Sequence, residues 1–175
     1  MIKNEKNFHY LNDYSDFSFK DSARFKRIYF PLCGISSAYL KSSITPYLSG
    51  DIKIDKNHYL TKPASREDLL FPTRNVYLNV GEEIISVANG QQFEPFVSAG
   101  LLWHEVRFHC LSSPLEVTVL NFIPVSGMNV EMMRVTIENK GSAEVAVTPT
   151  ISIPIFARAL ANKHDHEHVT ALLHR

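Results

Sequence analysis

Residues 115–122 read Leu115-Glu116-Val117-Thr118-Val119-Leu120-Asn121-Phe122, and this stretch decides the fold class. Successive side chains of a β-strand point to opposite faces, so the odd-numbered positions share one face and the even-numbered positions the other. Leu115, Val117 and Val119 make the odd face apolar, and Asn121 ends it. Valine, threonine and phenylalanine also favour strands. We predict a β-strand here, with its odd face on a core.

The same strand pattern recurs on both sides of this stretch. Residues 130–138 alternate a face of Met133, Val135 and Ile137 against a more polar face, and the turn-forming 139–142 separates them from β-formers at 144–153. Upstream, residues 76–80 and 84–87 flank a turn at Gly81, and residues 101–110 are rich in strand formers. Because no helix-length amphipathic segment separates the strands, we predict an all-β fold, an antiparallel β-sandwich.

Two further segments fill out the expected organisation. A single short helix is predicted at 65–70, where Ser65 would cap it. Residues 1–27 are polar with interspersed aromatic side chains, so we expect an N-terminal arm that docks on another surface, followed by the sandwich formed by 28–175. Since residues 172–175 are still apolar and motif-like, we expect that sandwich to be incomplete at its C-terminal end.

Composition narrows the classes of partner. The chain has 175 residues, 45% hydrophobic and 21% charged, with a formal net charge of +0, which suits one globular domain and gives no general attraction to nucleic acid or to an anionic membrane. No apolar run approaches the ~20 residues of a membrane-spanning helix, and the polar start lacks a secretion signal. We therefore expect no membrane association and a cytoplasmic protein in which Cys33 and Cys110 are buried thiols.

The segment 158–168 is the best candidate for a functional patch. In an extended chain, its histidines at 164, 166 and 168 would project from one face, which is one way to hold zinc. Consecutive strand positions close a tetrahedron poorly, so a polar network that binds backbone or sugar hydroxyls is favoured and no metal is expected. The tentative substrate-binding residues are Arg158, Asn162, Asp165, His166 and His168.

Other chemistry is sparse. Tyr47, Tyr59 and Trp103 could stack on a sugar, although aromatic side chains in a sandwich more often belong to the core. The chain has no nucleophile elbow, no phosphate-binding glycine loop and no His-Glu-x-x-His motif. No catalytic residue is therefore assigned.

The chain resembles the N-terminal region of glycoside hydrolase family 94, formerly glycosyltransferase family 36, and is most similar there to 1,2-β-oligoglucan phosphorylases and cyclic β-1,2-glucan synthases. The resemblance runs from about Arg27 to the end of the chain. The stretches that carry it include Tyr29-Phe30-Pro31-Leu32-Cys33, Ser43-Ile44-Thr45-Pro46, Gly50-Asp51-Ile52-Lys53, Thr73-Arg74-Asn75, Leu102-Trp103-His104, Phe122-Ile123-Pro124-Val125 and Val130-Glu131-Met132-Met133. Its most specific part comprises Thr148-Pro149-Thr150, Ile153-Pro154, Arg158, Asn162, Asp165-His166, His168-Val169-Thr170 and Leu172-Leu173-His174-Arg175.

The resemblance implies a super-sandwich domain that precedes a catalytic (α/α)6 barrel. Such enzymes split a β-glucoside with inorganic phosphate, invert the anomeric centre and release α-glucose 1-phosphate, using one carboxylic acid of the barrel and no cofactor besides phosphate as co-substrate. The implied partners are a β-gluco-oligosaccharide and the downstream barrel. One departure stands out, because the chain has Ala157-Arg158-Ala159 where Gly-Arg-Ser is expected in relatives.

Three functions follow as hypotheses. The first is the sandwich portion of a phosphorylase, which would leave an incomplete hydrophobic face and hence stability that depends on a partner domain or on a homo-oligomer. The second is a stand-alone carbohydrate-binding module with a self-contained fold. The third is a β-sandwich for protein interaction.

Overall fold

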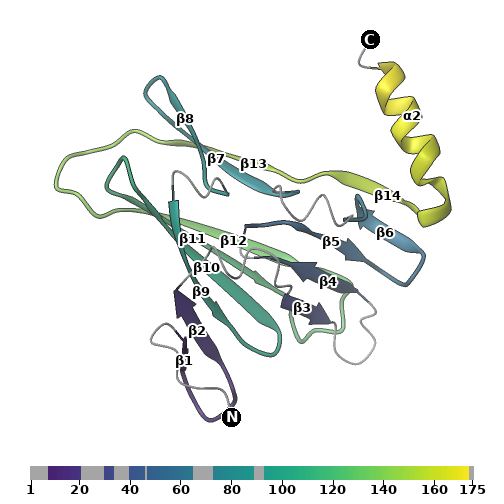
Figure 1. The fold of residues 1–175 in the computed structure, drawn as a ribbon, viewed down its shortest axis with the longest axis horizontal. Coiled ribbons are helices and arrows are strands. Elements are labelled where there is room, and N and C mark those ends of the chain that lie inside the picture. Colours follow the sequence, from purple (N-terminus) through teal and green to yellow (C-terminus); the bar gives the residue numbers. More distant parts are fainter. Residues whose placement is uncertain are drawn as a thin grey trace.

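A computed structural model of the chain describes residues 8–20, 30–33, 40–45, 47–64, 73–88 and 93–173. These residues form three antiparallel sheets, arranged as the all-β sandwich type that the sequence predicts (Figure 1). The helix predicted at 65–70 lies outside the described residues, and so does the segment 21–29 between the N-terminal strands and Phe30.

The large sheet has six strands in the order β1-β2-β9-β10-β11-β12. Their bounds are β1 Phe8–Tyr10, β2 Phe17–Lys20, β9 Phe93–Ala99, β10 Trp103–Cys110, β11 Leu115–Phe122 and β12 Met132–Asn139. The predicted strand at 115–122 is confirmed to the residue, and its odd-numbered side chains are all buried. The described part of the N-terminal arm forms the hairpin β1–β2, whose second strand pairs with β9.

Two smaller sheets complete the sandwich. The small sheet has the order β13-β7-β8, with β7 Asn75–Val80, β8 Glu83–Ser86 and β13 Thr148–Ser152. The side sheet has the order β14-β6-β5-β4-β3, with β3 Phe30–Cys33, β4 Lys41–Ile44, β5 Gly50–Lys53, β6 His58–Thr61 and β14 Ile155–Ala159. The predicted turn at Gly81 joins β7 to β8, with a positive φ of 63°.

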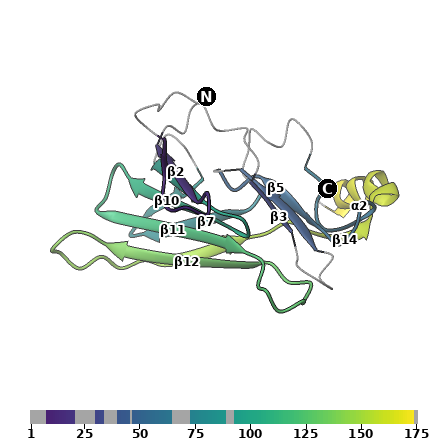
Figure 2. The same ribbon diagram turned by 90° about the horizontal axis from the view of Figure 1, so that it is seen from below.

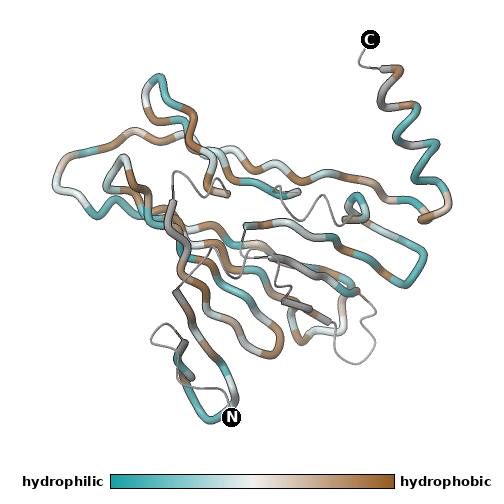
Figure 3. The backbone as a smooth tube through the Cα atoms, viewed as in Figure 1, coloured by the Kyte–Doolittle hydropathy of each residue, from teal (hydrophilic) through white to brown (hydrophobic). Residues whose placement is uncertain are grey.

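The main core lies between the large and the small sheet. Val117 and Phe108 from the large sheet and Leu78 and Ile85 from the small sheet are almost completely inaccessible to solvent. Each such side chain contributes roughly 1.5–3 kcal/mol on burial. A second apolar group lies against the side sheet and comprises Leu32, Leu40 and Ile123 with the half-buried Ile52 and Leu60. Figure 3 shows apolar stretches following these strands, while the tips of the β1–β2 and β5–β6 hairpins are mostly hydrophilic.

The C-terminal segment corrects the sequence analysis. Residues 160–162 form a 3₁₀ turn, η2, and Lys163–Leu173 form the α-helix α2, which extends away from the sheets beyond β14 (Figure 1). The sequence analysis considered only an extended conformation for the histidine-rich segment and did not predict this helix. Lysine, glutamate, alanine and leucine favour the helix, and Asp165 in its first turn interacts favourably with the helix dipole.

Within the described residues, neither helix combines the length and the apolar character that crossing a membrane requires. Cys110 is a buried free thiol, as predicted.

Candidate functional site

A surface hollow of about 520 Å³ lies where β6 and β14 meet at one end of the side sheet. Small-molecule pockets usually have volumes of about 300–1,000 Å³. Three segments line the hollow: the turn that leaves β5, the strand β6 and the end of β14. Its lining residues are Ile54, Asp55, His58, Tyr59, Leu60, Ala157, Arg158 and Ala159.

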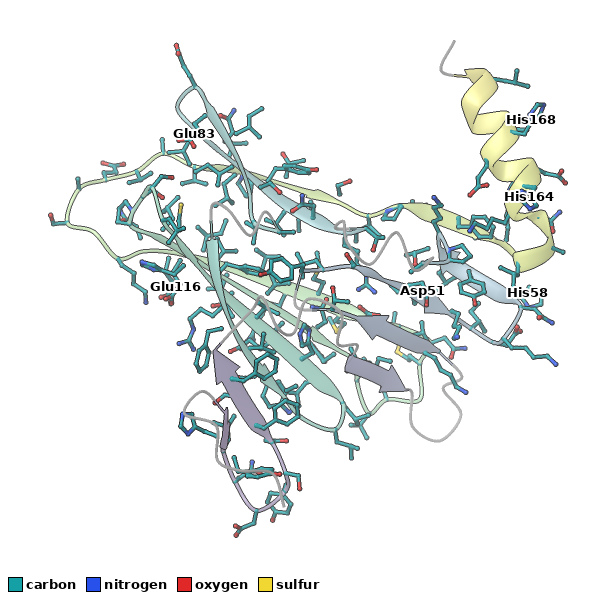
Figure 4. The ribbon with its side chains drawn as sticks, in the orientation of Figure 1. Asp51, His58, Glu83, Glu116, His164 and His168 are labelled. Carbon is teal, nitrogen blue, oxygen red and sulfur yellow. The ribbon has the colours of Figure 1, made fainter. Side chains whose placement is uncertain are left out.

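Asp55 organises the turn between β5 and β6. Its Oδ1 accepts hydrogen bonds from the backbone N–H groups of Asn57 at 2.7 Å and His58 at 3.0 Å, and its Oδ2 lies 2.7 Å from Nδ1 of His58. The hydrogen bonds from the Asn57 amide and from the His58 ring lower the pKa of Asp55. This turn therefore presents a carboxylate and an imidazole in a fixed arrangement, and Figure 4 shows His58 at this tip of β6.

Arg158 and Tyr59 face each other across the paired strands β14 and β6. Both line the hollow, and Nζ of Lys53 lies 5.7 Å from the centre of the Tyr59 ring. The guanidinium of Arg158 is exposed, and among the described residues no ion pair or hydrogen bond engages it. The hollow thus combines an aromatic ring with a free planar group of hydrogen-bond donors.

A β-bulge gives this end of β14 its shape. The register with β6 shifts between Ile155 and Arg158, and Ala157 adopts a φ of 48°. Left-handed backbone costs a non-glycine residue about 1–2 kcal/mol. Bulges are common next to functional sites because they re-aim side chains. A glycine at position 157 would adopt this conformation without strain.

Of the five predicted substrate-binding residues, the structure places Arg158 alone in the hollow. Asn162 ends the 3₁₀ turn, and Asp165, His166 and His168 lie along α2. Their helical spacing puts positions 164 and 168 on one face and position 166 on another, so the shared face that an extended chain would give these three positions does not form.

The start of α2 is held near the hollow by its own contacts. Glu167 lies 3.9 Å from Nζ of Lys62, which directly follows β6, and 4.0 Å from Nζ of Lys163. The N–H of Leu160 donates to the carbonyl of Asn57 at 2.6 Å. His58 and His164 accordingly lie at neighbouring ends of β6 and α2 (Figure 4).

The aromatic candidates separate into different environments. Tyr59 lines the hollow, whereas Tyr47 is 9% exposed and belongs to the core. Trp103 is half-buried, and its carbonyl accepts a hydrogen bond from Gly100 at 3.0 Å. Sequence reasoning missed Asp55 and His58, although Asp-Lys-Asn-His at 55–58 is a recognisable side-chain-stabilised turn.

A buried polar layer is the other cluster of chemical groups. The ion pair of Arg74 and Glu131 lies beside His104, while Asn121 is paired with His104 across β10 and β11. Burial, and secondarily the charge of Arg74, lowers the pKa of His104 to about 3. Because His104 and Asn121 have no exposed surface, we interpret this layer as part of the packing and not as a binding site.

Among the residues described, no group of three or more histidine, cysteine, aspartate or glutamate side chains could hold a metal ion. The comparisons add no family to this geometry. No protein-family model matches the chain, and a search of curated proteins finds no significant match.

Proposed function

We propose that the chain is the carbohydrate-binding β-sandwich of an inverting β-glucoside phosphorylase and has no catalytic activity by itself. Its ligand would be a β-gluco-oligosaccharide with β-1,2 or related linkages. The carrying observation is that Arg158, from the most specific part of the resemblance to family 94, lies beside Tyr59 in an open hollow.

The side chains of the hollow suit an uncharged sugar. A tyrosine ring offers an apolar face to the C–H groups of a pyranose and a hydroxyl at its edge. Arg158 can donate hydrogen bonds to ring hydroxyls, and Asp55 can accept them. Asp55 offsets part of the positive charge of Arg158 and of the nearby Lys53, and the chain has a formal net charge of +0.

The chemistry of the proposed parent enzyme lies in the barrel that the resemblance implies. There a carboxylic acid would protonate the leaving glycosidic oxygen while inorganic phosphate attacks the anomeric carbon from the opposite face. In this scheme the sandwich presents the oligosaccharide and takes part in no bond change. The start of α2, beside the hollow, is the segment that we expect to approach the barrel.

Binding can be measured by NMR titration of the ¹⁵N-labelled chain with sophorose, with maltose as the α-linked comparison. We expect sophorose to shift the amide signals of the hollow, and Tyr59→Ala and Arg158→Ala each to weaken binding about tenfold, as the loss of one good contact does. The matched control is Tyr14→Ala, because Tyr14 is 88% exposed on the β1–β2 hairpin and lies outside the hollow.

Catalysis needs a separate assay of phosphate release from glucose 1-phosphate, with glucose, sophorose or longer β-1,2-glucans as acceptors. No release by residues 1–175, together with sophorose binding in the hollow, is the expected pair of results. Sugar binding without activity even when a barrel domain is supplied would favour a stand-alone binding module. If the chain binds none of these sugars, a sugar-handling role is refuted. If the chain alone turns over substrate, the proposal that it has no catalytic activity by itself is refuted.

A further inference from the structure

The strand β12 forms one margin of the large sheet. Among the described residues its only strand partner is β11, with eight paired positions from Leu115–Asn139 to Phe122–Met132. Figure 2 shows β12 along the border of that sheet, opposite the side that carries β2. A free edge strand presents a row of unpaired backbone N–H and C=O groups, which is a template for another strand.

The apolar inner face of the sheet reaches this margin without being fully covered. Val117 and Val119 on β11 are completely buried, whereas their neighbours Ile137 and Val135 on β12 are only half-buried. These β12 side chains pack against the main core from its rim. A strand added to β12 would remove the exposed part of this apolar rim from water.

The outward face of β12 carries charges in a self-complementary order. Arg134, Thr136 and Glu138 lie at alternate positions and are exposed. In an antiparallel pairing of two copies about a two-fold axis through Thr136, Arg134 of each copy lies opposite Glu138 of the other. The same register sets Val135 opposite Ile137, and Thr136 opposite itself.

Neighbouring registers lack this complementarity. Centring the axis on residue 137 sets Arg134 opposite Lys140, and centring it on residue 135 sets Arg134 opposite Thr136. Opposite charges, threonine pairs and β-branched pairs each stabilise cross-strand neighbours, while like charges destabilise them. In the register centred on 136, all the pairs from 134 to 138 are of the favourable kind.

We propose that β12 pairs with β12 of a second copy of the chain, antiparallel and centred on Thr136, to form a continuous sheet across a symmetric homodimer. This pairing keeps the inner faces of the two copies on the same side, so the half-buried Val135 and Ile137 of one copy cover those of the other. It does not depend on sugar binding or on the family resemblance.

Charge reversal gives a direct test by sedimentation velocity over a range of concentrations. In Arg134→Glu, positions 134 and 138 both carry glutamate, and in Glu138→Arg both carry arginine, so like charges face each other across the two strands. The dimer of each variant should therefore have a dissociation constant about ten- to a hundredfold higher than the dimer of the parent chain. An equimolar mixture of the two variants should restore dimers, and so should the double variant Arg134→Glu/Glu138→Arg.

The control is Glu83→Arg, which reverses a charge on the exposed β7–β8 hairpin (Figure 4) and should not affect the dimer. Circular dichroism checks that each variant is folded. A chain that stays monomeric up to about 500 µM would overturn the proposal. Equally, it fails if the single variants dimerise as well as the parent chain, or if mixing them does not restore dimers.

A cysteine placed on the axis tests the register separately. Thr136→Cys should form a covalent dimer on mild oxidation, because directly opposed Cα atoms in an antiparallel pair lie about 4.5–5.5 Å apart, within disulfide range. Arg134→Cys should not, because its two copies would be separated by four residues, or roughly 14 Å. Equal cross-linking of both variants would exclude the register centred on Thr136.

Discussion

Arg74 and Glu131 form an ion pair inside the protein, with side-chain exposures of 1% and 2%. Arg74 directly precedes β7 of the small sheet, and Glu131 directly precedes β12 of the large sheet. The second guanidinium nitrogen of Arg74 donates to Oγ of Ser42 on β4 at 3.2 Å. One side chain therefore connects segments of all three sheets.

Removing the charge of Glu131 should destabilise the fold strongly. In Glu131→Gln the guanidinium of Arg74 stays buried without a counter-charge, and breaking a buried pair in this way costs about 3–5 kcal/mol. The double variant Arg74→Met/Glu131→Leu, which replaces both charges by apolar groups, should cost less than the single change. Urea unfolding followed by circular dichroism measures both. A single-variant loss under about 1 kcal/mol would contradict the burial of this pair.

His104 should make stability depend on pH in a defined window. Its pKa is about 3 in the folded chain, whereas an unfolded histidine titrates near 6.5, so between these values the unfolded chain binds more protons. Stability is then complete above about pH 6.5 and falls with decreasing pH, by about 2 kcal/mol between pH 7 and pH 5.

The control for this pH dependence is His104→Leu, compared by urea unfolding at the same pH values. The variant starts from a different stability at pH 7, but its slope between pH 6.5 and pH 5 should be nearly flat. The carboxylates with lowered pKa values, Asp55 and Glu138, remain largely ionised in that window and add little slope. An unchanged slope in the variant would assign the effect to other groups.

The strands were predictable because their signal is local. Alternation within residues 115–122 and 130–138 follows from which face of each strand packs on a core, and the structure has strands at Leu115–Phe122 and Met132–Asn139. The histidine-rich segment has no such periodicity, because nearly every side chain from Lys163 to His168 is polar. Over so few residues, alternation and helical spacing cannot be distinguished, so α2 was missed.

The candidate site was predictable only in part, since it depends on long-range pairing. Arg158 was identified from its own segment, but its neighbours Asp55 and His58 come from a turn about a hundred residues earlier in the chain. Only the pairing of β14 with β6, including its bulge, brings them together. Likewise, the buried position of Arg74 reflects the meeting of three sheets, which no local pattern encodes.

Ala157→Gly should stabilise the chain. Ala157 has a φ of 48°, and glycine would relieve the left-handed strain of about 1–2 kcal/mol. Glycine also makes the unfolded chain more flexible, which destabilises the folded state by about 0.5–1 kcal/mol. A net gain of up to about 1.5 kcal/mol in urea unfolding is expected. The reciprocal control is Gly81→Ala at a φ of 63°, where open space surrounds the new methyl group and the backbone strain alone should destabilise. A destabilised Ala157→Gly would argue against the bulge.

Gly100→Ala should disturb the N-terminal hairpin through Trp103. A methyl group at Gly100 would overlap Nε1 of the Trp103 indole and Oδ1 of Asp16 on the β1–β2 hairpin. The carboxylate can rotate away, but the indole is rigid and must shift, so we expect a loss of about 1–3 kcal/mol.

Trp103 is the chain's single tryptophan, so its fluorescence reports this site directly. The emission of Gly100→Ala should shift to longer wavelength as the half-buried ring moves toward water. Adding Trp103→Leu to Gly100→Ala should recover part of the stability relative to the sum of the single changes, because the smaller side chain removes the overlap. Additive losses in this double-mutant cycle, with an unshifted emission in Gly100→Ala, would show that Trp103 does not pack against Gly100.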